Sequence, residues 1–211
     1  MLIKVCGMRH PVNICEVEAL GIDWMGFIFW PHSSRYVSER PEYLPQTVKR
    51  VGVFVNATCD DICQTAETFG LDVIQLHGTE TPAFIQQLRN APATHSLQMV
   101  KAINVSTTDD LRLTEAYGGL VDYFLFDTKA QCVGGNGTQF DWSILTAYDG
   151  QTPFLLSGGI GPDDASRLSH FRHPLWAGID LNSRFETAPA QKDTKRLRTF
   201  LNQLSHNNEQ D

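Results

Sequence analysis

Eight short apolar segments recur along the chain, and most of them show little alternation between apolar and polar positions. Uninterrupted runs of this length are typical of strands that are buried on both faces of a parallel sheet. Their ends lie roughly 22 to 30 residues apart, which leaves room for one strand, one helix and two loops. Strands are therefore expected at 2–7, 25–30, 51–56, 73–78, 98–105, 122–128, 153–159 and 176–181.

Segments with helical features separate these runs. Apolar residues at 12–20 recur on one helical face. At 58–69 a threonine followed three residues later by an aspartate is a capping signature, and Pro82 suits the first turn of a helix at 81–90. Further helices are expected at 106–117, 162–169 and 192–204, and short or irregular helices at 38–50 and 141–148.

This order of elements predicts an α/β protein, a single (β/α)8 TIM barrel over residues 1–204. An open, doubly wound sheet is the competing arrangement. Eight evenly spaced units without an intervening linker favour the closed barrel. Residues 205–211 (SHNNEQD) are polar, and we expect them to form a frayed tail.

Composition narrows the classes of function. The chain has 211 residues, 42% of them hydrophobic, so it can bury a substantial core. Its net charge of −7 disfavours binding to nucleic acid or to an anionic membrane, although backbone N–H groups can still hold a small anion. No apolar run approaches the roughly 18 residues of a membrane span. The odd number of cysteines, five, and the lack of a signal-like segment lead us to expect free thiols in a cytoplasmic protein.

Two reactive side chains stand near the ends of strands that are otherwise apolar. Cys6 lies at the tip of the first expected strand and Asp127 at the end of the sixth, and active sites of such barrels lie at the carboxyl ends of the strands. Cys6 could simply be a buried small side chain, and Asp127 could cap the next helix. A glycine-rich segment, 134–137, follows Asp127 and makes a plain cap less convincing. The two groups could also act as an acid–base pair across the mouth of the barrel.

The last two strands are followed by segments suited to phosphate. The segment SGGIGP (157–162) contains Gly158 and Gly159, and adjacent glycines let backbone N–H groups turn toward an anion. A tight turn with no ligand is the alternative. After the eighth strand, Asp180 is followed by Asn182 and Ser183, which can begin a short helix. Loops after strands seven and eight are the usual phosphate site of this fold, so together they predict one here.

Other reactive residues carry weaker signals. Cys59 and Cys63 lie one helical turn apart, but no second pair of ligands accompanies them, so a zinc site is not favoured. His32 and His77 could line the mouth, although a lone histidine is more often a hydrogen-bonded structural residue. Lys101 could form a Schiff base, but a solvated or ion-paired lysine is the more economical interpretation.

Several motifs together give the chain a family likeness. It resembles the phosphoribosylanthranilate isomerases of tryptophan biosynthesis over nearly its whole length. The cysteine motif, SSRYV, QLHG and FDW are specific in combination. The matching segments are KVCGM (4–8), MGFIFWPHSSRYV (25–37), VGVFVN (51–56), IQLHG (74–78), LFDT (125–128), GGNGTQFDW (134–142), LLSGGI (155–160), GIDLNSRFE (178–186) and KD (192–193).

The resemblance implies a reaction and the residues that perform it. The reaction is the Amadori rearrangement of N-(5-phosphoribosyl)anthranilate to 1-(2-carboxyphenylamino)-1-deoxyribulose 5-phosphate. Cys6 would be the general base, Asp127 the general acid, and Arg35 the contact for the anthranilate part. The phosphate would be held by a group of five residues: Gly158, Gly159, Asp180, Asn182 and Ser183. The substrate nitrogen accepts the electrons, so the resemblance implies no cofactor and no metal, and a small molecule as the partner.

The chain departs from the family pattern at three places. Ser34 stands where a proline is frequent, Arg184 follows Ser183 where a glycine is frequent, and Ala190 replaces a glycine at an expected turn. Two other functions remain open: another barrel enzyme acting on a sugar phosphate, and a non-catalytic sugar-phosphate sensor. The sequence is compatible with either a monomer or a homodimer.

Overall fold

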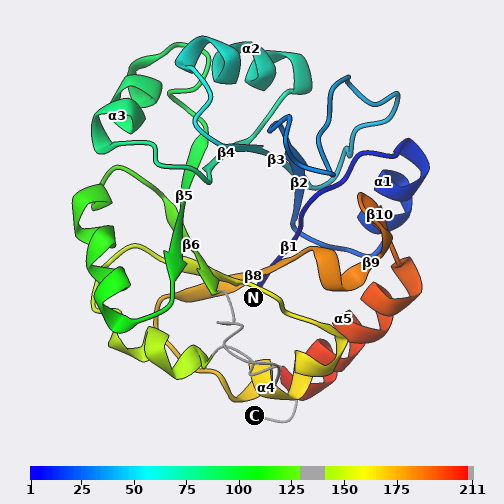
Figure 1. Ribbon diagram of the computed structural model, residues 1–211. Coiled ribbons are helices and arrows are strands. Elements are labelled where there is room, and N and C mark those ends of the chain that lie inside the picture. Colours follow the sequence, from blue (N-terminus) through cyan, green and yellow to red (C-terminus); the bar gives the residue numbers. More distant parts are fainter. Residues whose placement is uncertain (129–140, 209–211) are drawn as a thin grey trace.

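The computed structural model describes residues 1–128 and 141–208, and its eight long strands close into a parallel barrel. Each strand pairs with its neighbours in chain order, and β1 pairs with β8 to close the ring (Figure 1). This confirms the predicted (β/α)8 class. The strands are β1 (Leu2–Val5), β2 (Trp24–Ile28), β3 (Lys49–Phe54), β4 (Val73–Leu76), β5 (Gln98–Val105), β6 (Tyr123–Thr128), β7 (Phe154–Ser157) and β8 (Trp176–Leu181).

The helices lie around the outside of this ring (Figure 1). Thr58 and Thr81 cap α2 and α3 by accepting hydrogen bonds from the N–H groups of Asp61 and Phe84, as their sequence positions indicate. Two expected helices, at 106–117 and 141–148, are 3₁₀ helices. The helical elements are α1 (Pro11–Glu18), α2 (Cys59–Phe69), α3 (Pro82–Asn90), η1 (Thr108–Tyr117), η2 (Trp142–Ala147), η3 (Pro162–Asp164), α4 (Ala165–His170), η4 (Ser183–Phe185) and α5 (Thr194–Asn208).

The expected short helix at 38–50 is wrong. Residues 38–48 form no helix, and β3 already begins at Lys49. Pro41 and Pro45 remove backbone donors and disfavour helical geometry in the residues before them. The segment is held instead by Glu18, whose carboxylate accepts hydrogen bonds from the hydroxyl of Tyr43 at 2.5 Å and the backbone N–H of Thr47 at 2.6 Å.

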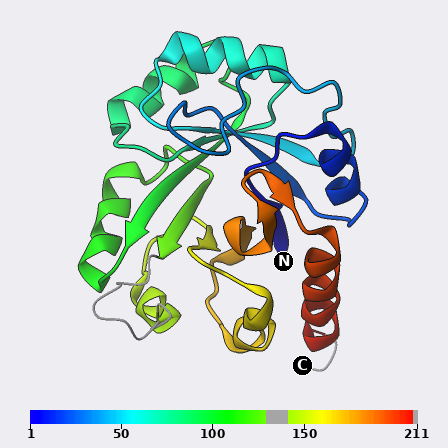
Figure 2. The same ribbon diagram turned by 45° about the vertical axis from the view of Figure 1, so that its right-hand side comes forward.

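A small hairpin precedes the last helix and was not predicted. Its strands β9 (Glu186–Ala188) and β10 (Gln191–Lys192) pair antiparallel and place Glu186 opposite Lys192. Ala190 takes a positive φ of 66° in the turn between them, a conformation that favours glycine. Lys192 is therefore part of a strand, not the start of the helix expected at 192–204. The hairpin follows β8, precedes α5 and lies beside α1 (Figure 1, Figure 2), where Asn13 bonds to Lys192.

The last helix is longer than expected. Helix α5 begins at Thr194 and continues to Asn208, so residues 205–208 of the expected frayed tail are helical, whereas 209–211 lie outside the described residues. Within the described ranges, no helix has the length and apolarity needed to cross a bilayer.

Two apolar layers hold the barrel together. The inner layer fills the lumen with side chains of Trp24, Val51, Val53 and Leu125 among others. The outer layer packs the other face of the strands against the helices, for example through Phe124, which is 1% exposed. Burial on both faces explains why the strand sequences lack alternation.

Candidate active site

A cavity of about 220 Å³ opens at the carboxyl ends of the strands. It is lined by Cys6, Ile28, Val53, Gln75, His77, Asp127, Ser157, Gly158, Gly159, Ile160, Asp180, Asn182, Ser183 and Arg184. Seven of the eight residues predicted for the site are in this set, and Arg35 is the exception. The closed barrel thus brings together side chains that are far apart in the sequence.

Cys6 lies directly after β1 and is 3% exposed. Its N–H donates to the carbonyl of Leu181 at 2.8 Å, which continues the pairing between β1 and β8. Gly26 on the neighbouring strand leaves space for the thiol, because a Cβ at that position would lie 2.7 Å from Cys6 Sγ. Burial raises the pKa of the Cys6 thiol, while attraction to Lys4 and Lys192 acts in the opposite direction. The thiol is therefore desolvated but has cations near it.

Below the thiol, a buried ion pair crosses from β1 to β8. Lys4 Nζ lies 2.9 Å from Asp180 Oδ1, and the two residues face each other in the strand register. Lys4 is fully buried and Asp180 is 7% exposed. Ser157 Oγ donates to the second carboxylate oxygen of Asp180 at 3.5 Å. Burial lowers the pKa of Lys4, but attraction to Asp180 and Cys6 outweighs it and raises that pKa overall. Asp180 is thus the partner of a lysine inside the barrel.

Asp127 stands across the cavity at the end of β6 and belongs to a chain of polar contacts. Its Oδ2 lies 3.3 Å from His77 Nε2, and Gln75 Nε2 lies 2.9 Å from His77 Nδ1. If the amide donates to Nδ1, the imidazole carries its proton on Nε2 and donates it to the carboxylate. Gln75 is 1% exposed, and its Oε1 has no partner among the described residues. His77 therefore orients Asp127 within the site.

Arg35 lies beside the cavity in a second cluster of charges. Its Nε and Nη2 donate to Glu186, with the shortest contact at 2.5 Å, and no described residue accepts a hydrogen bond from Nη1. Lys192 Nζ donates to Glu186 Oε1 at 2.5 Å and to Asn182 Oδ1 at 2.9 Å. The hydrogen bonds and charge of Glu186 raise the pKa of Arg35, whereas burial disfavours its charge.

Gly7 explains how this cluster reaches the thiol. Its φ is +77°, and a Cβ there would lie 2.6 Å from Arg35 Cδ and 2.8 Å from Asn182 Oδ1. Both side chains consequently pass directly over the residue that follows Cys6. Only glycine combines this backbone conformation with such close approach.

The segments predicted to bind phosphate border the cavity beyond the ends of β7 and β8. Gly158 and Gly159 have φ values of +97° and +73°. The N–H of Gly161 is already bonded to Asp164 Oδ2 at 2.8 Å. Arg184 lines the cavity, and its Nε lies 3.3 Å from the position that a Cβ of Gly161 would take. Arg184, which stands where the family pattern frequently has a glycine, therefore packs beside the glycine-rich segment 157–162.

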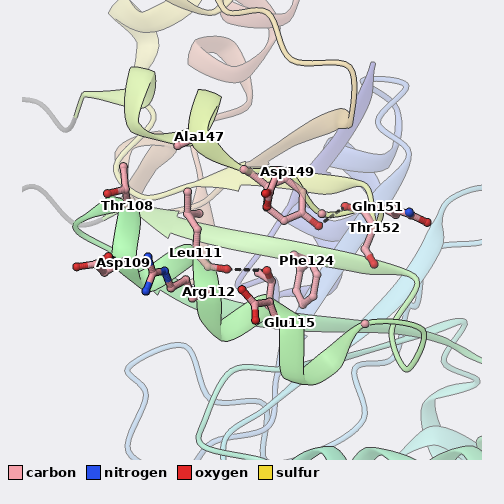
Figure 3. A pocket seen from close by; sticks show the side chains of 14 residues that line it. Thr108, Asp109, Leu111, Arg112, Glu115, Phe124, Ala147, Asp149, Gln151 and Thr152 are labelled. Atoms are coloured by element: carbon pink, nitrogen blue, oxygen red, sulfur yellow. Dashed lines mark hydrogen bonds and ion pairs between the residues drawn. The ribbon is translucent and has the colours of Figure 1, made fainter.

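A second hollow, of about 330 Å³, lies on the outside of the barrel between η1 and the segment after η2 (Figure 3). Polar and charged side chains such as Arg112, Glu115 and Asp149 surround it, and Phe124 lies at its base (Figure 3). None of the residues predicted for the site lines this hollow. Although this hollow is larger than the cavity at the strand ends, it is therefore not the better candidate for the active site.

Of the weaker sequence candidates, His77 lines the cavity, whereas Lys101 and His32 are not among its lining residues. Lys101 is 2% exposed and contacts Glu80 Oε2 at 3.2 Å and the carbonyl of Gly78 at 2.7 Å. It is an ion-paired lysine, as the simpler interpretation held. His32 packs on Trp30, with ring centroids 5.5 Å apart.

Two further predictions concern the thiols and the glycine-rich segment. Cys59 and Cys63 are free thiols, and no group of three or more metal-ligating side chains occurs among the residues that the structure describes. The segment 134–137 lies outside the described residues.

The family model described as N-(5'phosphoribosyl)anthranilate (PRA) isomerase matches residues 3–203. The chain belongs to this isomerase family. An N-(5'-phosphoribosyl)anthranilate isomerase of Phocaeicola vulgatus is 54% identical over 204 residues, which cover 97% of this chain and 98% of the relative. One from Parabacteroides distasonis is 49% identical over 212 residues, 98% of this chain and 94% of the relative.

Solved structures of phosphoribosylanthranilate isomerases have the same fold. The crystal structure from Thermotoga maritima aligns with a TM-score of 0.81 at 30% identity and covers 98% of this chain and 100% of its own. Another is a complex with reduced 1-(o-carboxyphenylamino)-1-deoxyribulose 5-phosphate, with a TM-score of 0.80 at 28% identity and coverage of 98% and 100%.

Four polar residues in or beside the cavity were not predicted from the sequence, namely Lys4, Gln75, Glu186 and Lys192. Glu186 and Lys192 stand in segments that already carried the family likeness, but only the structure shows that they form an ion pair. Lys4 alternates with Leu2 and Cys6 along β1, so its position on the inward face was a signal. Gln75 on β4 alternates in the same way with His77, which follows the strand.

Proposed function

We propose that this isomerase catalyses the Amadori rearrangement of N-(5-phosphoribosyl)anthranilate, with Cys6 as general base and Asp127 as general acid. The observation that carries the proposal is that both groups line one cavity, with two glycines in left-handed conformation beside them. A thiol and a carboxyl that line one cavity can act on neighbouring atoms of a bound sugar.

The substrate has two anionic ends, and we assign different donors to each. Arg35 would bind the carboxylate of the anthranilate ring through Nη1, because Glu186 already occupies Nε and Nη2. Backbone N–H groups at Gly158, Gly159 and Ser183, together with the Asn182 side chain, would hold the phosphate.

Asp180 is given a different role from the one that the resemblance implies. Its carboxylate lies 2.9 Å from Lys4 Nζ. A negatively charged carboxylate would repel the phosphate of the substrate instead of binding it. We propose that Asp180 fixes Lys4 beneath Cys6 and leaves phosphate binding to the neighbouring residues.

The reaction begins with two proton transfers, one from Asp127 and one to Cys6. Asp127, in its protonated form, donates to the ribose ring oxygen as the bond from that oxygen to C1′ breaks, and the lone pair of the anthranilate nitrogen forms an iminium. The thiolate of Cys6 then removes the proton from C2′, and the electron pair of that C–H bond neutralises the iminium. The resulting enolamine tautomerises to the ketone. The electrons come from and return to the substrate nitrogen, so the steps need no metal or redox cofactor.

The test follows the loss of substrate fluorescence when phosphoribosylanthranilate is made in situ. We expect Cys6→Ala and Asp127→Asn to lower kcat by roughly a hundredfold or more. Cys15→Ala is the matched control, because Cys15 is an exposed cysteine on α1 and should leave the rate unchanged. Arg35→Ala should raise KM first.

The outcomes separate the alternatives. Equal rates for wild type and Cys6→Ala would make Cys6 a packing residue. No turnover by wild type, with phosphate-containing ligands still bound, would favour a sensor or an enzyme for another sugar phosphate. We propose a cytoplasmic monomer or homodimer, and sedimentation equilibrium distinguishes the two assemblies.

A further inference from the structure

Lys192 is a buried cation with no assigned role in the reaction. It is 2% exposed, and its ammonium group contacts Glu186 at 2.5 Å and Asn182 at 2.9 Å. Its backbone is fixed as well, since its N–H donates to Asn13 Oδ1 at 2.7 Å and its carbonyl accepts from Asn13 Nδ2 at 3.0 Å. Burying a charged lysine costs folding free energy. A lysine fixed at both its backbone and its ammonium group therefore points to a function for its charge.

The ammonium group lies over the residue next to Cys6. Nζ lies 3.4 Å from the position that a Cβ of Gly7 would take, and Gly7 is the next residue after Cys6. Attraction to Lys192 favours ionisation of Cys6, and attraction to a Cys6 thiolate in turn favours the charge of Lys192. Burial nevertheless lowers the pKa of Lys192 overall.

The charged groups around the thiol are unevenly balanced, and Lys192 contributes to the positive side. On one side, Lys4 and Asp180 form a closed pair with no net charge. On the other side, Arg35 and Lys192 share the single carboxylate of Glu186, which leaves a surplus of one positive charge. Across the cavity stand His77 and Asp127, which contact each other. The surplus on the hairpin side therefore adds to the attraction by which Lys4, only partly opposed by Asp180, favours the thiolate.

We propose that Lys192 is a positioning residue for the base: its buried ammonium favours the thiolate of Cys6 and, through Glu186, orients Arg35. The catalytic part of this inference rests on the proposed function. When a substrate carboxylate binds Arg35, the cluster with Lys192 is neutral, whereas without Lys192 it carries a net negative charge that opposes the thiolate.

The test measures the thiol itself and needs no substrate. The rate of alkylation of Cys6 by iodoacetamide is followed by peptide mass spectrometry as the pH is raised, and its midpoint reports the thiolate. We expect Lys192→Met to leave about tenfold less thiolate at a given pH below the midpoint, and Lys192→Arg to stay near wild type. Lys101→Met is the matched control, because Lys101 is equally buried and ion-paired but contacts Glu80 outside the cavity.

A double variant separates charge from packing. Glu186→Gln with Lys192→Met restores the surplus positive charge of Arg35 and leaves no buried carboxylate unpaired, so the midpoint should return toward wild type. A midpoint unchanged by Lys192→Met, or a larger shift in the double variant than in the single one, would overturn the proposal. If the single variant does not fold, a wild-type midpoint in Lys192→Arg and in the double variant supports the proposal, and a shifted one overturns it. This experiment measures the thiol and not turnover. Its outcome is therefore independent of whether the proposed isomerase reaction is correct.

Discussion

Removing Lys4 should destabilise the barrel strongly, because it would leave Asp180 as an unpaired charge inside the protein. The Lys4 side chain is fully buried, that of Asp180 is 6% exposed, and the only other described hydrogen bond to this carboxylate is the long one from Ser157 at 3.5 Å. Breaking a buried pair by removing one partner typically costs about 3–5 kcal/mol. For a chain of this size, such a loss lowers Tm by roughly 6–20 °C.

The assay is urea unfolding of Lys4→Met beside wild type, followed by circular dichroism. The double variant Lys4→Met with Asp180→Leu removes both charges and should recover most of the loss, since a buried pair replaced by apolar residues of similar volume is often neutral. Arg112→Ala is the control: its ion pair with Asp109 is solvent-exposed on both sides, so no measurable change is expected.

The reasoning would be refuted if Lys4→Met lost less than about 1 kcal/mol of unfolding free energy. That result would mean that water or a rearranged side chain compensates Asp180. A double variant as unstable as the single one would instead attribute the loss to lumen packing.

Three further predictions concern the site. Gly7→Ala should raise KM in steady-state assays, because a Cβ would displace Arg35, and the positive φ adds about 1–2 kcal/mol of strain, measurable by unfolding. His77→Ala should lower kcat with little change in KM, because it removes the hydrogen bond that orients Asp127; an equal change in both constants would contradict that role. Burial raises the pKa of Cys6, so the folded protein holds that proton more tightly than the unfolded chain. This stabilisation is complete below the unfolded thiol pKa of about 8.5 and is lost as pH rises through the folded pKa. Unfolding of Cys6→Ala followed against pH should therefore show a shallower alkaline fall than wild type.

Local signals predicted most of the elements correctly. Thr58 and Thr81 begin helices because a side-chain oxygen can satisfy a free N–H group within the same turn. Where local signals conflicted with proline chemistry, as at Pro41 and Pro45, the expected helix was wrong. The hairpin at Glu186 and Lys192 escaped prediction because its strands are two and three residues long, too short for a periodic pattern.

The candidate site was predictable where one rule applied to every strand. Polar residues at the carboxyl ends of buried strands must meet, because a closed parallel barrel places all those ends on one face. That rule brought Cys6, Asp127, Gly158 and Asn182 to one cavity. It could not show which side chain contacts which.

By itself, the sequence determined the barrel and the face on which its chemistry gathers, because hydrophobic runs and strand ends are local features repeated along the chain. Only the tertiary structure decided the partners: Lys4 meets Asp180 across 176 residues of chain, and Arg35 meets Glu186 across 151. The physical reason is that an ion pair depends on atomic distance and burial, which are properties of the closed barrel and of the hairpin packed beside it. The charge around Cys6 is therefore a consequence of the fold and not of any one motif.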